Sequence, residues 1–149
     1  MGAAADRARS PAYLPVLALA GLLAPLTAGA CSVADAPDAP PLLTLPSDGG
    51  NWTVSIETSP QPPRKGTADV TYRITDGAGA PADGLTLDVL PWMPAHGHGT
   101  SVTPLVTAQG DGAYLVSPVY LYMAGHWELR TQIHGGAVDD SVVPAFDVP

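Results

Sequence analysis

Proline and glycine are the residues that most restrict how this chain can fold. The sequence contains 17 prolines and 16 glycines among 149 residues. Both destabilise helix interiors, because proline lacks a backbone donor and glycine loses the most conformational freedom on folding. Only 13% of the residues are charged, which is too few for the Lys- and Glu-rich surfaces of long helices or coiled coils. We therefore expect short helices at most.

From residue 52 onward the apolar residues alternate with period two, as in strands with one buried face. Trp127, Leu129 and Ile133, for example, alternate with polar residues. Similar runs cover residues 52–57, 69–75, 85–89, 101–107, 113–122 and 141–148, with turn-forming residues between them. The pattern predicts an all-β fold, a single immunoglobulin-like antiparallel β-sandwich of about seven strands. Pro118 and Pro144 lie inside two runs and predict bulges or edge strands, because proline cannot donate to a ladder.

The first thirty residues have the layout of a secretory signal peptide. Arg7 and Arg9 precede an uncharged apolar segment, residues 12–30. It ends in Ala28-Gly29-Ala30 before Cys31, which resembles the lipobox of bacterial lipoproteins. We predict that residues 1–30 are a lipoprotein signal peptide and that lipidated Cys31 anchors the exported protein to a membrane, in the periplasm or on the outer surface. An uncleaved membrane anchor, or an ordinary leader with a chance cysteine, is the alternative.

Residues 31–50 are expected to be a disordered tether between the lipid and the folded domain. Residues 34–41 consist only of Ala, Asp and Pro. Such a composition buries too little apolar surface to fold and extends as a semi-rigid spacer. The β-sandwich domain is accordingly expected over residues 51–149.

The charge balance and the residue inventory exclude two broad function classes. The formal charge is −8, from 14 acidic and 6 basic residues, whereas nucleic-acid binding requires clustered Lys and Arg. We find no Ser–His–Asp spacing, no reactive cysteine in the mature domain and no phosphate-binding loop. We expect neither a nucleic-acid partner nor an enzyme.

Two loops contain most of the histidines and methionines. Residues 91–99 contain Met93, His96 and His98, and residues 123–126 contain Met123 and His126. His96 and His98 are two positions apart, so in extended backbone both imidazoles project to the same side. Thioethers and imidazoles are soft or borderline ligands that favour a copper ion, Cu(I) in particular, over Mg²⁺ or Ca²⁺. The five residues are the predicted copper ligands, with His126 as an optional contributor, because Trp127 beside it must point inward.

Strand parity predicts that these two loops meet. If consecutive strands run antiparallel, the loops after the third and fifth expected strands, residues 85–89 and 113–122, lie at one end of the sandwich. His134 closes the next strand and belongs to the opposite end. We therefore exclude His134 from the predicted site.

The same segments resemble a known family. Residues 91–99 (Pro-Trp-Met-Pro-Ala-His-Gly-His-Gly), 112–114 (Gly-Ala-Tyr) and 123–129 (Met-Ala-Gly-His-Trp-Glu-Leu) resemble the YtkA-like domain of exported bacterial proteins, over about residues 51–148. The resemblance implies a small immunoglobulin-like sandwich outside the cytoplasm. It also implies a relation to copper-handling modules such as the CopC-like proteins.

Two functions of different classes follow from these observations. In the first, a lipid-anchored domain binds copper for buffering, or for transfer between donor and acceptor proteins of the envelope. In the second, Trp92, Met93 and the histidines form a contact patch of a non-metal interaction module in an envelope complex. The methionine sulfurs discriminate between them. Convergence on one open pocket with His96 favours metal binding, and outward scattering favours protein contact.

Overall fold

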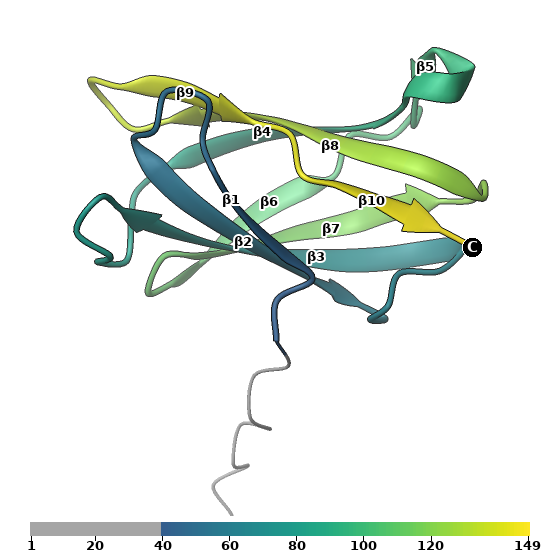
Figure 1. Cartoon of the computed structure of the whole chain (residues 1–149), viewed down its shortest axis with the longest axis horizontal. Helices are drawn as coiled ribbons and strands as arrows, with labels where there is room; N and C mark the ends of the chain where they lie inside the picture. Colours follow the sequence, from purple (N-terminus) through teal and green to yellow (C-terminus); the bar gives the residue numbers. More distant parts are fainter. Residues whose placement is uncertain (1–39) are drawn as a thin grey trace, which may run out of the picture. The chain divides into compact units, whose positions relative to one another are not determined.

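A computed structural model describes residues 40–149, which form a sandwich of two antiparallel sheets (Figure 1). The first sheet has the strand order β1 (Leu43–Pro46), β2 (Trp52–Ser59), β3 (Gly66–Asp76), β7 (Ala113–Leu121) and β6 (Leu105–Gly110). The second has the order β10 (Ala145–Val148), β8 (Gly125–His134), β4 (Thr86–Met93) and β5 (His98–Gly99), and β9 (Asp139–Val142) also pairs with β8. The predicted all-β, immunoglobulin-like sandwich is confirmed.

Helical structure is minimal, as the proline and glycine content predicted. In the described part of the chain, the one helical element is a single 3-10 turn, η1 (Pro94–His96), between β4 and β5. Within those same residues, no helix has the length and apolarity that a membrane crossing requires.

The core lies between the two sheets and is formed by the alternating apolar residues. Val54 and Ile56 of β2 and Val70 of β3 are fully buried, in one cluster with Leu129 and Ile133 of β8, which are also fully buried. One polar contact joins the sheets inside this core. The Tyr72 hydroxyl of β3 lies 2.9 Å from the Thr131 hydroxyl of β8.

Both prolines that predicted bulges or edge strands lie at irregularities of the sheets, Pro118 within β7 and Pro144 between two strands. The register between β3 and β7 shifts between Ala68 and Val70, opposite the position of Pro118. Pro144 separates β9 from β10, and its carbonyl accepts a hydrogen bond from the Leu129 amide at 2.8 Å. Each irregularity lies where a proline cannot donate to the ladder.

The folded domain begins earlier than the expected boundary at residue 51. β1 pairs with β2 in the register Leu43↔Ile56 to Pro46↔Thr53, and Leu42, Leu43 and Leu45 pack against the core. This short apolar segment follows directly on the Ala-, Asp- and Pro-rich stretch, whose composition led us to extend the tether across it. The predicted signal peptide and lipidated Cys31 lie outside the described residues.

Candidate functional site

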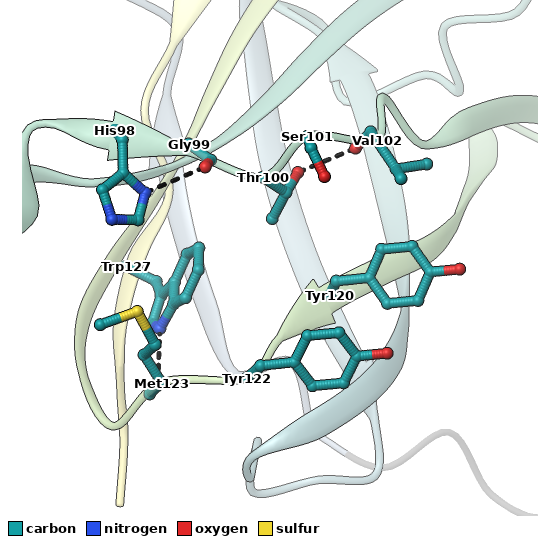
Figure 2. A pocket seen from close by; sticks show the side chains of 9 residues that line it. All are labelled: His98, Gly99, Thr100, Ser101, Val102, Tyr120, Tyr122, Met123 and Trp127. Carbon is teal, nitrogen blue, oxygen red and sulfur yellow. Dashed lines mark hydrogen bonds between the residues drawn. The ribbon is translucent and has the colours of Figure 1, made fainter.

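The loop after β4 and the turn after β7 come together at one end of the sandwich, as strand parity predicted. Figure 2 shows the pocket between them, which has a volume of about 380 Å³. His98 and Met123 both line it, from the first and second loop respectively. The other lining residues come from β5 and the segment after it, from the end of β7 and the residue after it, and from the core face of β8: Gly99, Thr100, Ser101, Val102, Tyr120, Tyr122 and Trp127.

The turn between β4 and β5 brings the two histidine rings together. Pro94 begins η1, and Gly97 ends it with a left-handed backbone (φ +66°), its amide donating to the carbonyls of Met93 and Pro94 at 3.0 and 3.1 Å. The expectation of extended backbone between the histidines is therefore wrong, because His96 belongs to the 3-10 turn and His98 to β5. The rings nevertheless lie close, with centroids 5.7 Å apart.

This ring separation suits a shared metal ion. An imidazole nitrogen lies about 2 Å from a bound transition metal, so two rings on one ion have centroids on the order of 5–6 Å apart. Both side chains are exposed. His98 Nδ1 is 3.1 Å from the carbonyl oxygen of Gly99. When Nδ1–H donates to this carbonyl, the lone pair of Nε2 is left free, the arrangement usual in metal-ligating histidines.

Met123 presents its thioether to the same pocket. The residue is half-buried, and the Trp127 indole N–H donates to its carbonyl at 2.9 Å, which ties the turn to the core (Figure 2). Met123 and His98 are thus a soft sulfur and a ring nitrogen on the walls of one cavity.

Met93, by contrast, is a core residue. Its side chain is 1% exposed and does not line the pocket. A Cβ added at Gly125 would lie 2.7 Å from Met93 Cε, so the methionine packs directly beneath the glycine that begins β8. The structure does not bring Met93 to the pocket with His98 and Met123.

His126 also lies apart from the pocket. Its ring is exposed, and Nδ1 is 3.0 Å from Asp147 Oδ1 on β10. The alternation of β8 explains this position, because buried Trp127 points inward and its neighbour points out.

His134 lies at the opposite end of β8, paired with Thr86, as predicted. Its Nδ1 is 2.9 Å from Asp139 and its Nε2 is 3.4 Å from Asp88. The hydrogen bond to Asp139 raises the pKa of His134 above its ordinary value, and the charge of Asp88 adds to the effect. His134 is therefore part of a surface ion-pair cluster with Asp139 and Asp88.

Two aromatic residues of the pocket, Tyr120 and Tyr122, are not among the residues predicted from the sequence. The Tyr120 and Tyr122 rings stack with centroids 5.3 Å apart, and the Tyr122 side chain is 64% exposed. Their i, i+2 spacing around buried Leu121 was the available signal, because it places both rings on one face at a strand end.

The two methionine sulfurs do not converge with His96 on one pocket. Of the predicted ligands only His98 and Met123 line it, and the His96 ring lies beside that of His98. Among residues 40–149, no group of three or more His, Cys, Asp or Glu side chains is arranged to hold a metal ion. A metal site here needs the sulfur of Met123, which restricts it to a soft ion.

Comparison with known proteins gives one match. The family model described as YtkA-like matches residues 47–132, more than half of the chain. The matched range includes both loops that form the pocket. No curated protein and no solved structure matches the chain.

Proposed function

This chain belongs to the YtkA-like family, as its motifs predicted, and from that premise we propose that the domain binds one copper ion at the mouth of the pocket. His96, His98 and Met123 would hold the ion. The single observation that carries the proposal is the grouping of these donors, with the imidazole centroids 5.7 Å apart and His98 sharing the pocket with Met123. Buried Met93 and outward-facing His126 are left out of this ligand set.

The ligand types favour Cu(I). Thioether sulfur is a soft donor that selects Cu(I) over harder divalent ions. His98 lines the pocket and both histidines are exposed, so a bound ion would stay within reach of another protein. The net charge of −8 also raises the local concentration of cations. These features suit buffering, or transfer between a copper donor and a copper acceptor of the envelope.

The test is a Cu(I) titration of the purified chain against a competing chelator under reducing conditions. We expect one bound equivalent, and a loss of affinity of at least about tenfold in His96→Ala/His98→Ala and in Met123→Leu. The leucine substitution keeps the apolar bulk of the side chain and removes the sulfur. His126→Ala and His134→Ala are the matched controls and should leave the affinity unchanged. Unaltered binding in the double histidine variant would overturn the proposal.

We propose further that the domain acts outside the cytoplasm on a lipid anchor at Cys31. The apolar segment 12–30 and the Ala-Gly-Ala-Cys sequence support this location. In cells, the chain should fractionate with membranes, and Cys31→Ser should release it into the soluble exported fraction. If the Cys31→Ser variant remained with the membranes to the same extent, lipidation at Cys31 would be contradicted.

A non-metal interaction module is the second candidate, and exposed apolar side chains at the pocket favour it. Val102 is 45% exposed and Tyr122 64% exposed. The patch differs from the one expected from the sequence, because Met93 is buried and the Arg130 guanidinium lies 4.6 Å from the Trp92 ring centroid. This candidate predicts partner capture that is independent of copper and lost in Tyr122→Ala.

A further inference from the structure

The pocket beside the histidines is larger and more apolar than three metal ligands require. Its volume of about 380 Å³ is in the range of small-ligand sites. The lining contains no Asp, Glu, Lys or Arg side chain, although the chain carries a formal charge of −8. Exposed apolar side chains gathered around a cavity mark a contact surface, here Val102 and Tyr122. The chemistry of the lining therefore suits an uncharged, apolar occupant.

The donor atoms at the mouth restrict that occupant further. At the proposed site His96, His98 and Met123 would supply three ligands, which leaves room on Cu(I) for one further soft ligand. Methionine is the uncharged apolar side chain that carries such a donor. Its thioether also packs well against aromatic rings, and the pocket supplies Trp127, Tyr120 and Tyr122 (Figure 2).

We propose that the copper-exchange partner of this domain inserts a methionine, carried on an extended uncharged segment, into this pocket. The inference rests on the proposed copper site. In the exchange, a lone pair of the partner's sulfur forms a Cu–S bond, and a Cu–N bond to the exposed His96 breaks. The ion remains Cu(I), and neither an electron nor a proton is transferred.

The probe is a short, end-blocked peptide of glycine and serine with one central methionine. Its control has norleucine, which replaces the sulfur by a methylene group and keeps the shape. Both peptides are titrated into the full chain, with and without bound Cu(I), and two-dimensional NMR spectra of the isotopically labelled protein report binding. We expect the methionine peptide to bind the loaded chain at least about tenfold more tightly than the norleucine peptide. In the copper-free chain the two peptides should bind equally, through the apolar lining alone.

The signals that move locate the binding site. We expect shifts of the Trp127 indole N–H and of the Val102 and Tyr122 amides. A matched pair of variants tests the surface, because Val102 is 45% exposed beside the pocket and Val143 is 41% exposed elsewhere. Val102→Ser should weaken binding of the methionine peptide, and Val143→Ser should leave it unchanged.

The results distinguish a failure of the methionine inference from a failure of the proposed copper site on which it rests. Cu(I) binding with equal affinity for the two peptides would overturn the methionine inference and leave the copper site intact. Shifts confined to residues outside the pocket would do the same. A chain that binds no Cu(I) in the titration without peptide would overturn both.

Discussion

The contact between the Tyr72 and Thr131 hydroxyls, which joins the two sheets, predicts unequal losses of stability for substitutions at the two positions. Tyr72 on β3 is fully buried and Thr131 on β8 is 1% exposed. The Thr131 hydroxyl donates to the Leu129 carbonyl at 3.0 Å. Its remaining lone pairs accept from the Tyr72 hydroxyl at 2.9 Å. Burial raises the pKa of Tyr72 above its usual range, and the contact with Thr131 only partly opposes this, so the phenol is neutral and a donor at assay pH.

The direction of this hydrogen bond makes the two single substitutions unequal. Tyr72→Phe removes a donor and leaves Thr131 still donating to Leu129, so it should cost about 1 kcal/mol of unfolding free energy. Thr131→Val keeps the shape but leaves the Tyr72 O–H buried without an acceptor, which should cost about 2–3 kcal/mol. In the double variant no stranded donor remains. Its cost should fall below the sum of the two by about 1–2 kcal/mol.

Urea unfolding followed by tryptophan fluorescence measures all four proteins, because Trp52 and Trp127 lie in the core. Equal slopes against urea would show that the substitutions change stability and not the unfolded state. If the cost of the double variant equalled the sum of the two single costs to within about 0.5 kcal/mol, the proposed hydrogen bond from Tyr72 to Thr131 would be refuted. It would also be refuted if Tyr72→Phe were the more damaging change.

Three further predictions concern single positions. Burial opposes ionisation of Asp140, but hydrogen bonds from the 47–51 turn and the next amide hold its pKa well below the usual range. The stability that ionised Asp140 adds is therefore present above about pH 3.9 and lost as the pH falls through its folded-state pKa. In urea unfolding, Asp140→Asn should cost about 1–2 kcal/mol at neutral pH. The unfolding free energy of this variant should also depend less on pH in the acid range. Gly112→Ala would place a Cβ 2.4 Å from the Ile74 carbonyl at φ +69°, so thermal unfolding should show a cost of about 2–4 kcal/mol, against about 1 kcal/mol for the unobstructed Gly110→Ala. Met93→Leu should lower the unfolding free energy by less than about 1.5 kcal/mol and leave Cu(I) affinity unchanged, whereas Met123→Leu should weaken Cu(I) binding and leave stability nearly unchanged.

The sequence predicted the sandwich well because alternation is a local signal that burial enforces. Trp127, Leu129 and Ile133 had to share a face, and the core uses them in that way. Strand parity extended this local signal to a long-range result, the meeting of the two loops. The first strand, Leu43–Pro46, was missed because four residues beside a proline-rich stretch give no usable period.

The composition of the site was less predictable than its location. The sequence of a short loop does not determine where its two histidine side chains point. Here the 3-10 turn and the left-handed backbone of Gly97 bring the two rings together. His126 could be placed by parity, because its neighbour Trp127 had to be buried. Tyr120 and Tyr122 were overlooked because their importance depends on what lies opposite them, which only the tertiary structure defines.

The two methionines show why residue type alone does not identify a ligand. Met93 closes β4 and takes the inward position in its alternation, whereas Met123 lies in the turn between β7 and β8, where no ladder dictates the side-chain direction. Gly125 joins the two roles, because its lack of a side chain lets Met93 fill the core beneath the very turn that carries Met123. Two methionines that look alike in the sequence thus have different roles in the fold: Met93 packs in the core because a strand position turns it inward, and Met123 is a candidate ligand because it lies outside any strand.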